Sequence, residues 1–290
     1  MAAIAYIADH KMLEFHRLNS SKVMYFWRLS IKNSFSDFKE GDIIFFLDKK
    51  IKRNKEKGIV GFARLDRIYV NAPKTLWNKY KKGNGYNSFN EFREAICRVS
   101  KNHELPKQIT SFCLKDVIFL GGPIYLSEFN INVSNNLESY VYIKPETMVL
   151  DMLDRAKDII DVWSYSEDMD KILEDEKIAY SLRLINNEYG DYPLREDKYK
   201  RAHNLMKKLI ERNPLCNFIG NSKLDLYYID NKNVLIVLYA SKKMDIRYVI
   251  GQAELYRNNI YRYYKDSYKL YFKTSNGDKK LEAILNKQFL

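Results

Sequence analysis

Lysine and arginine gather in two short stretches of this sequence whose side chains could contact a polyanion. The stretches contain Lys49, Lys50, Lys52, Arg53 and Lys55, and then Lys79, Lys81 and Lys82. Both include Asn or Gly and are typical of exposed loops, from which cationic side chains reach phosphate oxygens without reading a base sequence. They are therefore candidate phosphate contacts, with solvated hairpin tips as the alternative interpretation.

The positive charge is placed unevenly along the chain. Of the 290 residues, 1–145 include 24 Lys/Arg and 14 Asp/Glu, a net +10, whereas the whole chain carries +12. A positive field concentrated over one part of a protein attracts a polyanion and gives salt-dependent affinity through counterion release. The first half is therefore predicted to bind nucleic acid, although a merely basic surface would have the same composition.

Other familiar chemistries find no support in the residue spacing. The four histidines are scattered, there is no Gly-rich phosphate loop, and no Ser/His/Asp set can be argued. The three cysteines (Cys97, Cys113 and Cys216) are too far apart for a spaced zinc site and odd in number. No apolar run reaches the roughly 18–20 residues that cross a bilayer. The start of the sequence lacks a basic n-region, so we expect a cytoplasmic protein that does not engage a membrane.

The elements that must position these residues differ between the two halves. Short apolar runs predict strands at 24–30, 42–47, 59–70, 117–119 and 140–143, and a helix at 88–99 that begins with Ser88 as cap and Glu91 three residues on. This pattern indicates a small, strongly bent β-barrel. Residues 146–190 are rich in acids at helical spacing and read as a helical connector.

From residue 191 the predicted order is helix, three strands, helix, strand. The helices are expected at 195–212 and 246–264, and the strands at 215–219, 224–229, 234–240 and 268–273. Such an order predicts an α/β domain with a mixed sheet.

This second half resembles the RecB-like branch of the PD-(D/E)XK nuclease superfamily. The resemblance is carried by the stretch from Gly220 through Asp225 to Ile229, by 235–241 at the position of the acid–any–lysine motif, and by Gln252 and Tyr256 in the following helix. It implies a restriction-endonuclease-like fold in which two carboxylates hold Mg²⁺ against a phosphate and a lysine stabilises the developing charge.

The sequence lacks two of the residues that catalyse the reaction in that family. Asp225 is present as a metal ligand, but Val237 replaces the second acid and Tyr239 replaces the lysine. A lone carboxylate holds Mg²⁺ poorly, so we expect a degenerate site that needs no cofactor. The alternative is an active Mg²⁺-dependent endonuclease with relocated groups. The relocated candidates are Glu196, Glu211, Glu254, Lys242 and Lys243, beside the vestigial catalytic set of Asp225, Gln252, Tyr256 and Lys242.

Residues 22–145 resemble the PUA-like superfamily, and EVE-type domains in particular, which read modified bases. Tyr25-Phe26-Trp27, the 39–46 run with Gly41-Asp42, and Gly58 to Ala63 carry this resemblance. It implies that one nucleotide is extruded into an aromatic pocket and stacks on side chains there. Trp27, Phe35 and Trp77 are the candidate pocket residues, and Lys50, Lys52, Arg53, Lys81 and Lys82 are the candidate phosphate contacts.

Together these features predict three segments and a function. We expect a PUA/EVE-like β-barrel (1–145), a helical connector (146–190) and a restriction-endonuclease-like mixed-sheet domain (191–290). The favoured function is binding of DNA with a modified base, as in modification-dependent restriction factors, with the nuclease site degenerate. The alternatives are the active endonuclease and a non-catalytic RNA-binding or regulatory adaptor. A homodimer is also considered, since cutting two strands usually takes two sites.

Overall fold

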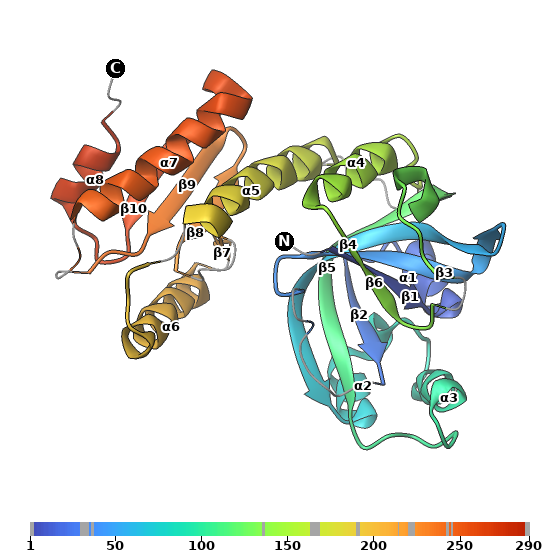
Figure 1. Ribbon diagram of the computed structural model, residues 1–290. Helices are drawn as coiled ribbons and strands as arrows, with labels where there is room; N and C mark the ends of the chain where they lie inside the picture. Colours follow the sequence, from blue (N-terminus) through green and yellow to red (C-terminus); the bar gives the residue numbers. More distant parts are fainter. Residues whose placement is uncertain are drawn as a thin grey trace. The chain divides into compact units, whose positions relative to one another are not determined.

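The computed structural model divides the chain into two compact units, unit 1 (Met1–Asp170) and unit 2 (Lys171–Leu290). It describes residues 3–29, 35, 38–134, 137–162, 169–189, 192–213, 215–219, 224–241, 244 and 246–287. Each unit has its own sheet and helices (Figure 1).

Unit 1 is built on a curled, open sheet (Figure 1). Among the described residues it has six strands in the order β2-β5-β4-β3-β1-β6, with β1 parallel to β3 and every other pair antiparallel. The strands are β1 (Ala3–Ala8), β2 (Val23–Arg28), β3 (Ile43–Arg53), β4 (Glu56–Asn71), β5 (Ile109–Ile124) and β6 (Tyr140–Ile143). The described sheet is strongly bent, as the strand pattern predicted (Figure 1). Because β2 and β6 are its opposite edges, it is an open half-barrel.

Helices cover unit 1 and complete its core. They are α1 (His10–Leu18), α2 (Pro73–Tyr80), the 3-10 turns η1 (Lys81–Asn84) and η2 (Leu126–Phe129), α3 (Phe89–Val99) and α4 (Glu146–Lys157). α3 begins as predicted, with Ser88 Oγ accepting from Glu91 N at 3.2 Å. Apolar residues of α1, α2 and α3 pack with Phe26, Phe46 and Phe112 of the sheet in one buried cluster. These three helices and the sheet therefore share one apolar core.

Several elements of unit 1 differ from the sequence-based expectations. β5 extends over 16 residues, where only 117–119 were predicted. No element was predicted for 3–18, yet β1 lies inside the sheet and is buried along its whole length. A strand that is buried on both faces shows no apolar–polar alternation, which is the signal the prediction depended on.

Unit 2 contains the predicted order of helix, three strands, helix and strand. Its elements are α5 (Met169–Tyr189), α6 (Glu196–Arg212), β7 (Asn217–Phe218), β8 (Leu226–Asp230), β9 (Asn233–Leu238), α7 (Ile246–Tyr264), η3 (Lys265–Ser267), β10 (Lys269–Thr274) and α8 (Lys279–Leu285). α5 begins two residues before the unit boundary. The described strands pair in the order β10-β9-β8-β7, with β10 parallel to β9, so the sheet is mixed. The strand predicted at 215–219 shortens to two residues.

The core of unit 2 forms on both faces of this sheet. α5, α7 and α8 pack with Tyr227, Ile236 and Phe272 on one face. On the other face α6 packs with Leu226 and, less deeply, Val237. No helix in the described part of the chain is long and apolar enough to span a bilayer.

Candidate functional site

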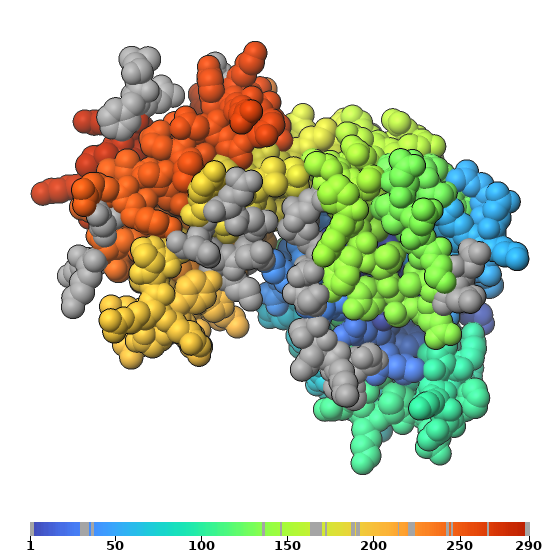
Figure 2. Space-filling model, in the orientation of Figure 1, coloured from blue at the N-terminus to red at the C-terminus, as the bar shows by residue number. Residues whose placement is uncertain are grey.

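The first basic stretch forms the end of the long hairpin of β3 and β4. Arg53 pairs with Glu56, and the two residues between them have positive φ, 50° at Asn54 and 69° at Lys55. Two successive residues with positive φ are typical of a type I′ turn, which matches the twist of a hairpin. The exposed basic side chains of this end are Lys49, Lys50, Lys52, Arg53 and Lys55. Figure 2 shows the light-blue atoms of the hairpin end projecting at the surface.

The cations of the hairpin are close enough to act on one another. The pKa of Lys57 is lowered, first by partial burial and then by the positive charges of Lys52 and Lys49. Arg53 is anchored, because it donates to Glu128 at 3.0 Å and lies 4.0 Å over the ring of Tyr125. Lys49, Lys52 and Lys57 therefore form a cluster of like charge on the hairpin.

The second basic stretch lies beside aromatic rings. Tyr80, at the end of α2, stacks on Tyr25 of β2 with centroids 3.6 Å apart and ring planes 16° apart. Lys79 Nζ lies 5.1 Å from the centroid of Tyr80 and 5.4 Å from that of Tyr69. Lys81 and Lys82 follow, exposed, in η1. These lysines therefore lie beside half-buried tyrosine rings, in a helical segment rather than in the exposed loop that the sequence pattern predicted.

The three aromatics assigned to a base pocket are placed differently from one another. Phe35 is buried in the core among Phe38, Phe112 and Tyr140. Trp27 and Trp77 are half-buried, and each packs against Phe92 of α3. Trp27 and Trp77 therefore share Phe92 as a neighbour, whereas Phe35 contacts neither of them in the contacts described. Their role in base stacking remains a prediction.

Asp225, the predicted metal ligand, lies immediately before β8 and is 0% exposed. Its carboxylate accepts hydrogen bonds from the hydroxyl of Tyr192, from Tyr256 Oη at 3.0 Å and from the backbone N–H of Tyr239 at 3.2 Å. Asn186 Nδ2 donates to Tyr256 Oη at 3.0 Å and extends this network into α5. Burial raises the pKa of Asp225 to about 6, and the three hydrogen bonds oppose that shift.

The surroundings of Asp225 do not fit Mg²⁺. Its oxygens are directed to three protein donors, whereas Mg²⁺ requires near-octahedral oxygen ligands and usually several waters. At the two positions where the sequence resemblance implied an acid and a lysine, Val237 has no side-chain oxygen and Tyr239 contributes its backbone N–H. In the part of the chain that the structure describes, no three His, Cys, Asp or Glu residues are grouped to hold a metal ion. The arrangement is that of a buried hydrogen-bond centre.

The other candidates for a nuclease site are distributed over unit 2. Gln252 is 3% exposed on α7, one turn before Tyr256. Glu196 is exposed and pairs with Lys200 at 2.8 Å, and Glu254 pairs with Arg257. Lys242 and Lys243 lie outside the described residues. The structure therefore gathers Asp225, Tyr256 and the unpredicted Tyr192, and places these two relocated acids in helix-surface ion pairs.

A polar pair in unit 1 was missed by the sequence analysis. His10 Nδ1 lies 2.6 Å from Asp48 Oδ2, and Asp48 is 2% exposed. His10 lines a cleft of about 410 Å³ between α1 and α3. A buried carboxylate that fixes one ring nitrogen leaves the other available for acid–base work. The described lining of the cleft contains no Ser, Thr or Cys nucleophile, and 38 residues separate the two partners, so no local spacing could have revealed them.

Comparisons with known proteins give fold likenesses only. No family model matches this chain, and no curated protein matches it significantly. Among solved structures, the crystal structure of ASCH from Zymomonas mobilis is 17% identical, with a TM-score of 0.36 over 52% of this chain and 94% of that chain. Crystal structures of two single-residue mutants of the same protein are 18% identical, with TM-scores of 0.36 and 0.37.

Proposed function

We propose that this protein binds nucleic acid through unit 1, and that the β3–β4 hairpin contacts the phosphate backbone. The observation that carries the proposal is the hairpin end with exposed Lys49, Lys50, Lys52 and Lys55. The charges of Lys49 and Lys52 also act on Lys57. Neighbouring cations repel one another in the free protein. A bound polyanion removes this repulsion, and the release of its counterions makes the binding free energy more favourable.

The shape of the hairpin favours duplex DNA over duplex RNA. A two-stranded β-ribbon fits the major groove of B-DNA, which is about 12 Å wide. The major groove of A-form RNA is deep and too narrow for side chains to read. The turn at Asn54 and Lys55 would enter the groove first, and the lysines on either strand would face the phosphates that border it.

Rigid anchoring of the hairpin supports this role. Glu56, beside the turn, accepts hydrogen bonds from Ser127 N at 2.8 Å and Ser127 Oγ at 2.6 Å. Asp48, further down β3, accepts from Lys50 N at 2.8 Å and faces His10. An arm fixed in its bound conformation loses less conformational entropy on binding. The β3–β4 hairpin is therefore a preorganised element.

The finer proposal is that the DNA carries a modified base and that unit 2 does not cleave it. Half-buried Trp27 and Trp77 are the rings that could stack on an extruded base. For unit 2, the support is the full set of protein donors on Asp225, which gives this carboxylate a structural role. An Mg²⁺-dependent endonuclease is the competing function, and it requires Asp225 to exchange these donors for metal.

The test measures the affinity for a labelled 20-base-pair duplex as a function of salt, using fluorescence anisotropy. In the triple variant Lys50→Gln, Lys52→Gln and Lys55→Gln, the slope of log K against log salt should become shallower by about 0.9 per lost phosphate contact, about 2.7 for three. The control variant, Lys280→Gln with Lys287→Gln, changes exposed lysines at the other end of the chain.

Different results test the role of the hairpin, the recognition of a modified base and the absence of cleavage. An unchanged slope and affinity in the triple variant would overturn the role of the hairpin. Duplexes with methylated or hydroxymethylated cytosine test the finer proposal, which predicts tighter binding that weakens in Trp27→Ala. Cleavage of any of these duplexes with Mg²⁺ that disappears in Asp225→Ala would establish the competing function.

A further inference from the structure

Beside α6, part of one face of the unit 2 sheet lies outside both core clusters that the described residues form. Three residues in register across β8, β9 and β10 form a row on this face: Tyr228, Leu235 and Tyr271. Tyr228 and Leu235 are half-buried and Tyr271 is 47% exposed. Within the described residues, none of the three belongs to either core cluster of unit 2. The row is an aromatic–aliphatic–aromatic strip across the sheet.

Cations stand on both sides of this strip. On β10, Lys269 and Lys273 are exposed and each lies two residues from Tyr271, so all three side chains share one face. That spacing places each lysine about 6.6 Å along the strand from the tyrosine. The neighbouring row consists of Asp230, Asn233 and Lys269, which are in register across β8, β9 and β10. Asp230 is the one carboxylate among the residues of these two rows. The face therefore combines stacking rings with a net positive charge.

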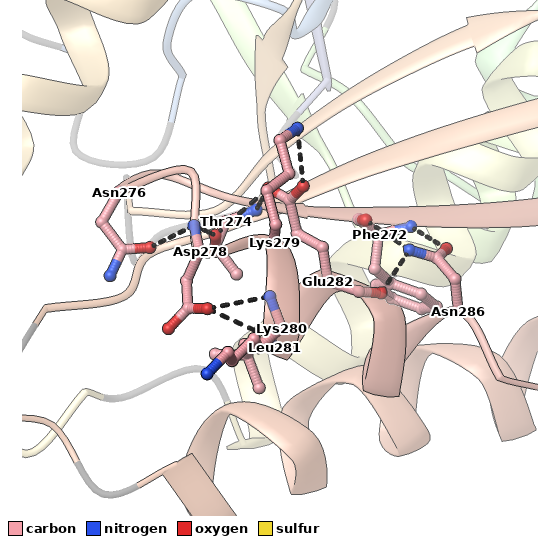
Figure 3. Close-up of polar contacts among 9 residues, drawn as sticks. All are labelled: Phe272, Thr274, Asn276, Asp278, Lys279, Lys280, Leu281, Glu282 and Asn286. Atoms are coloured by element: carbon pink, nitrogen blue, oxygen red, sulfur yellow. Dashed lines mark hydrogen bonds and ion pairs between the residues drawn. The ribbon is translucent and has the colours of Figure 1, made fainter.

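At the β10 edge of this sheet, side chains bond the backbone groups of the strand. Figure 3 shows Asn286 accepting from Phe272 N and donating to Phe272 O, both at 2.8 Å. Glu282 accepts from Thr274 N at 3.0 Å. Glu282 lies in α8 and Asn286 caps its C-terminal end. Leu281 of the same helix packs in the core on the opposite face of the sheet. Glu282 and Asn286 satisfy backbone groups that would otherwise pair with another strand.

We propose that this face of unit 2 is a second binding site, for a single strand of nucleic acid. Bases would stack on Tyr228 and Tyr271, which lie about 10 Å apart across three strands. Phosphates on either side of the base on Tyr271 would contact Lys269 and Lys273. Aromatic stacking between basic side chains is how proteins bind single strands without sequence preference. A second copy of the chain fits less well, because a twofold contact would bring lysines against lysines.

This site is independent of the β3–β4 hairpin, and the experiment keeps the two apart. Binding of labelled oligo-dT and oligo-U of twelve nucleotides is measured by anisotropy with the full chain carrying the three Lys→Gln changes in the hairpin. Tyr271→Ala should weaken binding about 5- to 100-fold, the loss of one base stack, whereas Tyr271→Phe should retain it. Tyr261→Ala removes a tyrosine of similar exposure, 58%, from α7 and serves as the control.

Each result decides the matter. If Tyr271→Ala and Tyr228→Ala bind both oligonucleotides as tightly as their parent, with unchanged thermal unfolding, the proposal is wrong. It is equally wrong if Tyr271→Ala changes the molar mass in light scattering and leaves oligonucleotide binding intact, because the face would then join two copies. A loss with oligo-U alone would assign the site to RNA, and a loss with both to single strands in general.

Discussion

The buried carboxylate of Asp225 should make unit 2 less stable at neutral pH than at mildly acidic pH. Burial raises the pKa of Asp225 from 3.8 to about 6 in the folded protein. Between about pH 4 and pH 6 the folded state therefore holds a proton that the unfolded chain has released. Stability falls as the pH rises through this window, and the stabilisation by the bound proton is absent above it.

The size of the effect follows from the shift in pKa. Each unit corresponds to about 1.36 kcal/mol, so a shift of about two units gives roughly 3 kcal/mol between pH 4 and pH 7. Asp225→Asn has nearly the shape of the protonated carboxyl and carries no charge. The variant should lose this pH dependence and should be more stable than the parent at pH 7 by up to that amount.

Hydrogen exchange followed by mass spectrometry measures this in unit 2 alone. Peptides from β8 and β9 are compared at pH 5 and pH 7, after correction for the intrinsic exchange rates. At pH 7 Asp225→Asn should slow their exchange by up to about 100-fold, the equivalent of about 3 kcal/mol. Asp230→Asn, which changes an exposed carboxylate at the end of the same strand, serves as the control.

Two results would refute this reasoning. Faster exchange in Asp225→Asn at pH 7 would mean that the ionised carboxylate stabilises unit 2 through its three donors by more than its burial costs. Slower exchange of the parent on addition of Mg²⁺, absent in the variant, would mean that Asp225 is a metal ligand after all.

Two further predictions concern the packing of unit 2. Glu176→Ala removes the carboxylate 2.7 Å from the buried guanidinium of Arg183 and should lower the free energy of unfolding in urea by about 3–5 kcal/mol. The paired change Glu176→Leu with Arg183→Met should recover most of this stability. A loss below about 1 kcal/mol in Glu176→Ala would contradict the prediction. Asn286→Ala removes two hydrogen bonds from Phe272 at the β10 edge, at about 1 kcal/mol each; exchange should quicken in the β10 peptide, and unchanged exchange would contradict it.

Local signals predicted the elements that they specify. α7 spans 246–264 as expected, since its apolar spacing is helical over five turns, and α3 begins at its capping box. Residues that depend on distant partners were not predictable in this way. β1 pairs with β3 and β6 from far along the chain. Tyr192 reaches Asp225 across 33 residues with no motif to mark it.

The two proposed surfaces differ in how the sequence encodes them. The hairpin is a run of lysines beyond the point where β3 leaves the core, and its burial pattern changes there from buried to exposed. Composition alone reveals such a run. The face of unit 2 is encoded by alternation in β10, where Lys269, Tyr271 and Lys273 point one way and Phe272 and Thr274 the other. That alternation marks an open face only once β9 and β8 are known to continue the row, because Leu235 and Tyr228 by themselves read as ordinary strand residues. Charge therefore identifies the first surface from the sequence, whereas strand register is needed to identify the second.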